Sequence, residues 1–340
     1  MNDNLFKKEK VKYIGNIKQF ATVNHYRFND GPGMNMRAVE VNNSSGIVFT
    51  VLPDRGMDIS GFSYKGINLS FLTPNSDISP SFYEPEGLGW LRTFNGGLLT
   101  TCGLTHFGPP YIEKTNGEHY GLHGRYSNLP AKQFSDNSRW IGDIYYVQLR
   151  AIIEEARLFG YKLRLTRTIT CKTGEAALSI DDCVENFGEE KSPIMLLYHI
   201  NIGYPFLCEE TEVQIDSVKA EPRDEISKKG FEKRFKAEMP QKGFKEQVFF
   251  YKLKSDKMGL AEVKVFNKRL GLILKVEYDS ISLPYLTQWK MCGISDYVMG
   301  IEPCNAPVLD RNYLKEKKLI QYLLPGKSKK FKLRISVEEV

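Results

Sequence analysis

Short apolar runs separated by turn signals recur along most of this 340-residue chain, and they constrain its fold more than any other feature. The clearest run, LRLTRTIT at 163–170, alternates apolar and polar residues with the period of two that is typical of a half-exposed strand. Helical periodicity is scarce, and neither an internal repeat nor a linker divides the chain. We therefore expect an all-β fold of antiparallel strands, formed as one domain over residues 1–340.

The expected strands are rich in β-branched and aromatic residues and are bounded by Gly, Pro, Asn and Asp. A run at 91–104 is expected to be a buried strand broken by Gly96-Gly97. The region 219–247 is charged and turn-rich, and only a short helix around 230–236 is expected there. The other expected strands cover 37–41, 46–52, 59–64, 68–72, 139–153, 161–171, 175–186, 193–206, 261–267, 270–278, 285–290, 320–324 and 330–337.

Charge distribution and cysteine spacing argue against several classes of protein. The net charge of +6 is spread over interleaved acids and bases, without the basic stripe of a nucleic-acid-binding protein. The six cysteines form no C-x-x-C pair, so we expect free thiols and neither a zinc ribbon nor a disulfide framework. No signal peptide or membrane span is apparent, and a cytoplasmic location is expected.

The segment 87–131 is the first candidate site, because it contains three of the five histidines among many glycines. Pro109-Pro110 and Asn116-Gly117 are turn signals. Gly121 and Gly124 flank His123, which predicts that its imidazole is not crowded by a bulky neighbour.

A second candidate lies in the apolar run PIMLLYHINIGYPF at 193–206. His199 and Asn201 are two residues apart, so they face the same side of a strand. Polar groups on one face of an apolar strand need partners, and a ligand can supply them.

Five motifs together resemble the galactose mutarotase-like superfamily, and within it the branch known as aldose 1-epimerase family proteins. In chain order they are GGLLTTCGLTHFGPP, YGLHGRYSNLPA, YHINIGYPF, GIEPCNAP and LLPGKSKKFKLRISV. The resemblance covers nearly the whole chain. It implies a β-supersandwich of antiparallel strands with a sugar cleft on one face, and an enzyme that interconverts sugar anomers.

The resemblance also implies the residues of the site. Glu302 in GIEP matches the glutamate that the family uses as base, and His123 and His199 match its first and second active-site histidines. We expect Glu302 to act at the anomeric hydroxyl, His199 to be the acid at the ring oxygen, and His123 to donate a hydrogen bond that supports the opening ring. At 95–97 this chain has Asn-Gly-Gly where hexose-6-phosphate epimerases have Arg-Gly-Gly, a departure from the phosphosugar enzymes. The residues expected to contact the sugar are Arg55, Arg92, Asn95, Arg125, Asn201 and Trp289.

The chemistry needs few groups. Opening a pyranose hemiacetal requires a base for the proton of the anomeric hydroxyl and an acid for the ring oxygen, and ring closure reverses both roles. No metal, nucleotide or redox cofactor is demanded, and the expected partner is a monosaccharide or sugar derivative, whether neutral, acidic or phosphorylated. Activity is expected to fall below the pKa of the glutamate and above that of the histidine. A monomer or homodimer is expected.

Two other functions remain open from the sequence. Glu118, His119, His123 and His106 resemble the ligand cluster of a metal-dependent, cupin-like sugar isomerase. In an extended strand, however, positions 119 and 123 lie ~13 Å apart, too far for one ion. The other alternative is a non-catalytic carbohydrate-binding protein that has kept the cleft alone.

Overall fold

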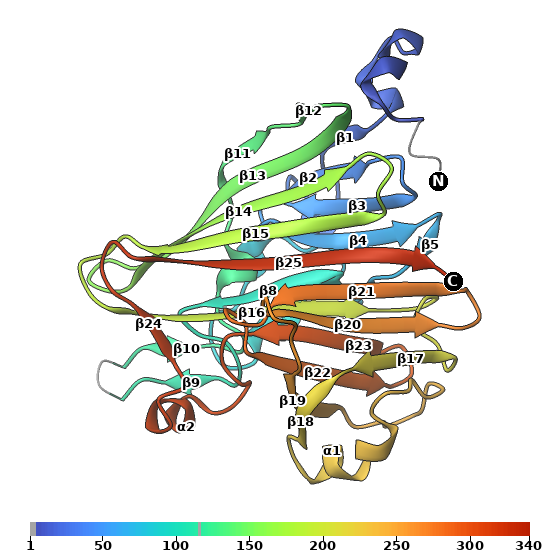
Figure 1. The fold of residues 1–340 in the computed structure, drawn as a ribbon. Coiled ribbons are helices and arrows are strands. Elements are labelled where there is room, and N and C mark those ends of the chain that lie inside the picture. The colour runs from blue at the N-terminus through green and yellow to red at the C-terminus, as the bar shows by residue number, and fades with distance from the viewer. Residues whose placement is uncertain (1–4, 115–116) are drawn as a thin grey trace.

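The computed structural model describes residues 5–114 and 117–340, and the chain folds mainly into antiparallel β-sheet. Two large sheets lie face to face, one in front of the other in Figure 1. The expectation of an all-β antiparallel fold is confirmed. Asn116, half of the turn expected with Gly117, lies outside the described residues.

Among the described residues the larger sheet has twelve strands. β5 (Ile67–Asn68) pairs with β4, and β24 (Gln321–Leu323) pairs with one end of β16. The remaining strands are, in spatial order, β1 (Thr22–Arg27), β2 (Arg37–Asn42), β3 (Ile47–Leu52), β4 (Asp58–Tyr64), β8 (Leu99–Leu104), β16 (Ser192–Ile202), β23 (Tyr297–Cys304), β22 (Tyr285–Cys292), β19 (Gln247–Leu253) and β18 (Ser217–Pro222).

The second large sheet has nine strands in the described part of the chain. In it β12 (Arg139–Ile141) pairs with β13, and two small ribbons stand apart, β6 (Phe71–Leu72) with β7 (Gly96–Gly97) and β9 (Tyr111–Ile112) with β10 (His119–Tyr120). The others are, in spatial order, β11 (Lys132–Asp136), β13 (Ile144–Ala156), β14 (Lys162–Lys172), β15 (Ala177–Asn186), β25 (Ser328–Glu339), β21 (Leu272–Asp279), β20 (Leu260–Asn267) and β17 (Thr211–Ile215).

The helices are short. The α-helices are α1 (Glu225–Lys229) and α2 (Arg311–Glu316), both near the lower edge in Figure 1. In the described residues no helix has the length and apolar character needed to cross a membrane. The 3₁₀ helices are η1 (Lys8–Tyr13), η2 (Ile17–Gln19), η3 (Gly31–Gly33), η4 (Pro80–Phe82), η5 (Gly89–Arg92), η6 (Tyr126–Asn128) and η7 (Phe231–Lys233).

Some expected elements differ from the structure. The run at 91–104 is not one strand, because its first residues belong to η5 and only 96–97 and 99–104 are extended. Gly96 and Gly97 have φ of 75° and 70°, and a Cβ on either would lie 2.5 Å from a backbone oxygen. The strand expected at 193–206 ends at Ile202, and the one expected at 68–72 is split between β5 and β6.

The helix expected around 230–236 lies earlier in the chain. α1 begins after Asp224, whose carboxylate caps it by accepting a hydrogen bond from the backbone of Ser227 at 2.8 Å. The single turn η7 follows it.

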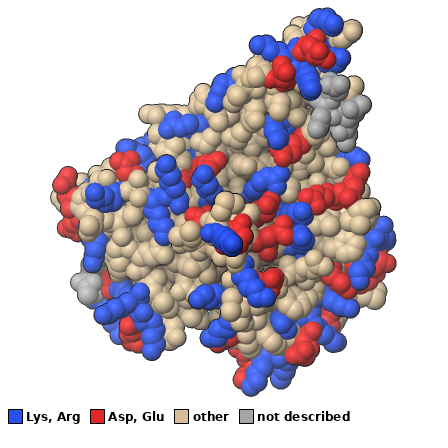
Figure 2. Space-filling view, viewed as in Figure 1, with Lys and Arg blue, Asp and Glu red and all other residues tan. Residues whose placement is uncertain are grey.

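Lysine and arginine are mixed with aspartate and glutamate over the face shown in Figure 2. Most of the ion pairs on the surface join neighbouring strands or turns, for example Lys132 with Glu154 and Arg334 with Glu175. Such exposed pairs contribute little to stability individually.

β16 separates two apolar cores. Leu196, Tyr198 and Ile200 point into the main core between the two large sheets. Met195 and Leu197 point to the opposite face, where they pack in a second core beneath the loops. Because side chains alternate along a strand, His199 is placed on that second, outer face.

A buried cation joins the two large sheets. Arg167 of β14 occupies an inward position in the apolar alternation and is fully buried. Its guanidinium donates to Asp182 at 2.8 Å and, across the gap between the sheets, to Asp58 at 3.0 Å and Thr101 at 3.0 Å. The hydroxyl of Tyr198 donates to the same Asp182 at 2.7 Å. Since buried charges are stable only when paired, this network fixes how the sheets pack.

Replacing Arg167 with Met should therefore lower the free energy of unfolding by about 3–5 kcal/mol, because two buried carboxylates lose their counter-charge. Urea unfolding followed by circular dichroism measures the loss. Adding Asp58→Asn and Asp182→Asn to the same variant should recover part of it. Arg164→Met, on the outward face of the same strand, is the control and should change stability by about 1 kcal/mol or less. Equal losses in the two single variants would contradict the role assigned to Arg167.

Candidate functional site

A cavity of about 470 Å³ opens on the outer face of the larger sheet. Its floor consists of side chains from four neighbouring strands, and its walls come from loops that cross this face. The volume lies within the range of small-molecule sites. The floor residues are His199 on β16, Glu302 on β23, Thr287 and Trp289 on β22, and Val248 on β19.

The strand register brings the floor residues together. Thr287 lies opposite Glu302, and Trp289 lies opposite both Gly300 on one side and Val248 on the other. A Cβ on Gly300 would stand 2.6 Å from a carboxylate oxygen of Glu302 and 3.0 Å from the Cβ of Trp289. Glycine at this position therefore leaves the space that the two larger side chains occupy.

His199 and Glu302 face each other at the bottom of the cavity. The Nε2 atom of His199 lies 3.2 Å from Oε1 of Glu302. This is ion-pair distance, and Oε1 has no other polar partner that satisfies a hydrogen bond among the described residues. The other ring nitrogen, Nδ1, lies 2.5 Å from the amide oxygen of Asn201, whose NH₂ group donates to the backbone oxygens of His199 and Gly96. Nδ1 is therefore the protonated nitrogen of the neutral ring, and Nε2 presents a lone pair to Glu302.

Aromatic rings enclose this pair. The ring of His199 lies 5.5 Å from Phe94, 5.4 Å from Trp289 and 6.4 Å from Trp90, measured between ring centres. Trp90 stacks on Phe94 at 4.5 Å and also contacts His123 at 4.8 Å. The cage removes water from the polar floor, which strengthens electrostatic effects there.

The cage shifts both groups of the pair toward their uncharged forms. Burial raises the pKa of Glu302 well above its usual value, and the nearby Glu246 carboxylate adds to the rise while Arg223 opposes it. Burial lowers the pKa of His199 to about 4, against the opposing hydrogen bond to Asn201. These shifts favour the protonated carboxyl of Glu302 and the neutral imidazole of His199.

His123 completes the polar floor from a loop. Its backbone has φ of 57°, and its amide donates to Gly108 while its carbonyl accepts from Gly103. Its ring lies 5.7 Å from that of His199, and burial together with that neighbour lowers its pKa well below the usual value. Its Nδ1 atom is buried without a hydrogen-bond partner in the described residues.

The glycines around His123 serve a different purpose from the one expected. A Cβ on Gly121 would lie 2.3 Å from the backbone oxygen of Pro85, and one on Gly124 would lie 2.1 Å from that of His106. Both glycines allow two backbone segments to approach closely, which holds the loop that positions the imidazole.

Three further residues of the cavity were not predicted from the sequence. Arg223 donates to Glu246 at 2.8 Å and to Asp224 at 2.8 Å, and Glu246 accepts from the indole of Trp289 at 3.0 Å. Arg223 and Glu246 flank the paired ends of β18 and β19 and lie in the region without periodicity. Thr287, the third, is on an expected strand, but only the pairing with β23 shows which face it occupies.

Only some of the six residues expected to contact a sugar lie at the cavity. Trp289 lines the cavity, and Asn201 lies directly behind His199. Arg55 is buried and donates to the backbone oxygens of Ile78 and Thr93.

Arg92 and Asn95, which were also expected to contact the sugar, lie outside the cavity wall as well. Arg92 is largely exposed beside Glu84, at 3.2 Å, and Asn95 donates to Asp77 at 2.9 Å. These contacts give structural explanations for both residues.

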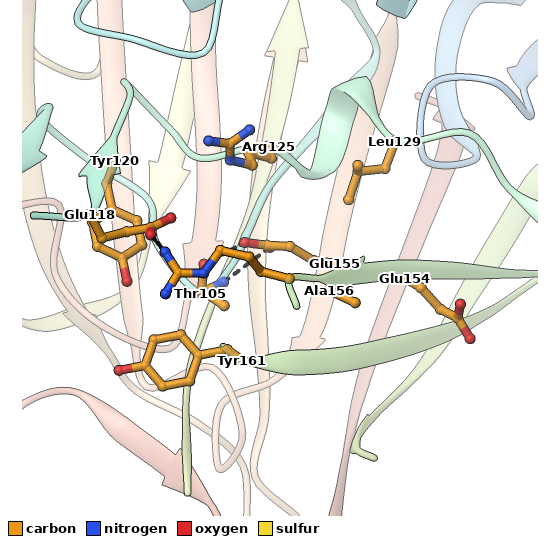
Figure 3. A pocket seen from close by; sticks show the side chains of 10 residues that line it. Thr105, Glu118, Tyr120, Arg125, Leu129, Glu154, Glu155, Ala156 and Tyr161 are labelled. Carbon is orange, nitrogen blue, oxygen red and sulfur yellow. Dashed lines mark hydrogen bonds and ion pairs between the residues drawn. The ribbon is translucent and has the colours of Figure 1, made fainter. Parts of the chain in front are cut away.

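Arg125 lies in a second, smaller pocket of about 250 Å³. Figure 3 shows it above Glu118 and Glu155. Glu118 forms an ion pair with Arg157, which lines the same pocket. Glu155 accepts hydrogen bonds from the backbone and hydroxyl of Thr105, so it anchors the loop after β8. Arg125 thus does not reach the pair formed by His199 and Glu302.

The residues of the metal-site alternative are not gathered around one point. Glu118 pairs with an arginine, His119 is exposed near a surface carboxylate, and His106 contacts the carbonyl oxygen of Pro109 at 2.9 Å. Of these four residues, only His123 lines the cavity. No group of three or more His, Cys, Asp or Glu side chains is arranged to hold a metal ion within residues 5–114 and 117–340.

Known structures share this fold. A candidate aldose 1-epimerase from Klebsiella pneumoniae superposes with a TM-score of 0.87 at 24% identity, over 95% of this chain and 86% of the other. A galactose mutarotase-like protein from Clostridium acetobutylicum gives 0.67 at 14% identity, over 95% and 100%. Galactose 1-epimerase from Lactobacillus acidophilus gives 0.59 at 14% identity, over 94% and 99%. The expected galactose mutarotase-like fold is thereby confirmed.

No curated protein sequence matches the chain. One family profile does match, over residues 33–337, which include all the residues of the cavity. The chain therefore belongs to the family described as Domain of unknown function (DUF4432).

Proposed function

We propose that this protein is an aldose 1-epimerase that interconverts the anomers of a monosaccharide by acid–base ring opening and closure. The observation that supports this most strongly is the pairing of His199 Nε2 with Glu302 Oε1 at 3.2 Å on the floor of a cavity of suitable size. The fold shared with sugar epimerases agrees with it. A base and an acid on one small substrate are the groups that this reaction requires.

The pair supplies both groups because it holds a single proton. Burial favours the protonated form of Glu302. A bound sugar brings hydroxyl donors, which stabilise the carboxylate form and so favour transfer of the proton across 3.2 Å to His199. The Glu302 carboxylate then takes the proton of the anomeric hydroxyl, and the His199 imidazolium gives its proton to the ring oxygen.

After this step the ring C–O bond is broken, the sugar is an open aldehyde and the pair has returned to its neutral form. Rotation about the bond next to the aldehyde and reversal of both transfers give the other anomer. His123 is suited to donate a hydrogen bond to the ring during opening, and the indole of Trp289 to stack on a sugar face.

Glu302→Gln and His199→Asn should each slow anomer exchange by on the order of 10²-fold or more, with sugar affinity and fold largely kept, because these groups act mainly in the transition state. Exchange between anomer signals in NMR spectra measures the rate. His119→Asn is the matched control, since this histidine is outside the cavity wall, and it should be unchanged. A near wild-type rate in either cavity variant would refute the assigned roles.

Activity should have a broad bell-shaped dependence on pH. A second proton enters the pair only as the pH falls through the lowered pKa of His199, about 4. The last proton leaves only as the pH rises through the raised pKa of Glu302. The acid limb thus corresponds to the histidine and the alkaline limb to the glutamate, the reverse of the sequence-based expectation, with both apparent values belonging to the coupled pair. A profile of kcat/KM that falls already between pH 5 and 6 would contradict this order.

Asn201 is a positioning residue in this proposal, because it fixes the tautomer of His199 through the bond at 2.5 Å. Replacing it with Asp should put a carboxylate beside Nδ1 and stabilise the imidazolium. The acid limb of the pH profile should then move upward by about 1–3 pH units. A structural role alone would lower the amount of folded enzyme but leave the limb where it is in the wild type.

A further inference from the structure

The charges of the cavity indicate an uncharged ligand. Arg223 is the cation of its wall in the described residues, and it already pairs with both Glu246 and Asp224. Arg92 and Arg125 lie elsewhere. A phosphate or carboxylate on the sugar would meet no free counter-charge there, and desolvating it would be unfavourable.

The two sides of the cavity differ in polarity. On the side of β18 and β19 the wall is made by Arg223, Glu246 and the indole of Trp289, which hydrogen-bond to one another and can exchange bonds with hydroxyls. Arg223 and Glu246 adjoin β18 and β19, which are separated from β8 by β16, β23 and β22 in the sheet, and Trp289 lies on β22.

The lining also has an apolar part. Leu88, Pro109, Leu122 and Val308 form it together with Gly108. Their segments are joined, because the backbone amide of Leu122 donates to the carbonyl of Gly87 at 2.9 Å and that of His123 to the carbonyl of Gly108 at 3.0 Å. A Val308 methyl would lie 3.7 Å from a Cβ on Gly108. This surface, defined by these five residues, is the apolar wall.

We propose that the substrate is an uncharged deoxy aldose whose methyl group, in the place of a hydroxymethyl group, packs on the apolar wall. This inference rests on the proposed function and specifies its substrate class. A hydroxyl packed against Leu122 and Val308, the half-buried side chains of the apolar wall, loses part of its water without gaining a partner. A methyl group in the same place buries apolar surface instead. The remaining hydroxyls are directed to Thr287, Arg223 and Glu246.

The test compares matched sugars that differ by one oxygen: 6-deoxygalactose with galactose, 6-deoxyglucose with glucose, and 6-deoxymannose with mannose. Dissociation constants are measured by calorimetry on Glu302→Gln, which separates binding from turnover, and anomer exchange is measured by NMR on the wild type. In at least one pair the deoxy sugar should bind and react about 10- to 100-fold better, the size of discrimination that an apolar pocket achieves against one added hydroxyl.

Val308→Thr provides the structural control, since it adds a hydroxyl to the apolar wall without changing its shape. It should reduce the preference for the deoxy sugar several-fold, whereas Val218→Thr, on an exposed position of β18, should leave the preference unchanged. If Val308→Thr keeps the full preference for the deoxy sugar, the place assigned to the methyl group is wrong.

The outcomes separate this inference from the proposed function. Preferential binding of a deoxy sugar without anomer exchange supports the substrate class and overturns the catalytic proposal. Exchange with equal or better use of the fully hydroxylated sugars supports catalysis and overturns the substrate class. Binding of none of the six sugars overturns both.

Discussion

The arrangement of this molecule depends on one buried guanidinium. Arg167 stands where the alternation of β14 calls for an apolar residue, and its five donors can be satisfied only if strands of both sheets approach it in one relative position. Apolar packing alone tolerates sliding of one sheet over the other, whereas this network does not. It extends to Tyr198 through Asp182 and so fixes which face of β16 is inward. A slip of one residue would turn His199 into the core.

Strand β16 shows what could be predicted from the sequence. His199 and Asn201 were placed on one face because the period of a strand is two, and that face proved to be the outer one. Glu302 was matched only through its motif, because GIEPCNAP has no alternation and a proline, yet it lies on β23. Its neighbours across the sheet, Thr287 on one side and the residues of β16 on the other, come from distant parts of the chain.

The remaining parts of the site depend on contacts that no local pattern encodes. Arg223 and Glu246 belong to a region without periodicity, and they meet Trp289 only because β18 and β19 extend the sheet beyond β22. Arg55 and Arg125 were expected near the sugar because arginine suits sugar hydroxyls. Arg55 donates to backbone carbonyls and Arg125 lines the smaller pocket, and both surroundings are set by the tertiary fold.

The aromatic cage around His199 has a consequence for how the protein can be observed. The chain has three tryptophans, and two of them, Trp90 and Trp289, form walls of the cavity. The third, Trp140, packs against Phe20 and Tyr145 away from it. Indole emission depends on the polarity of its surroundings and is quenched by a neighbouring imidazolium. Two of the three indoles therefore line the cavity in which the ligand and the proton transfer are proposed, so their emission is an optical reporter of its occupancy.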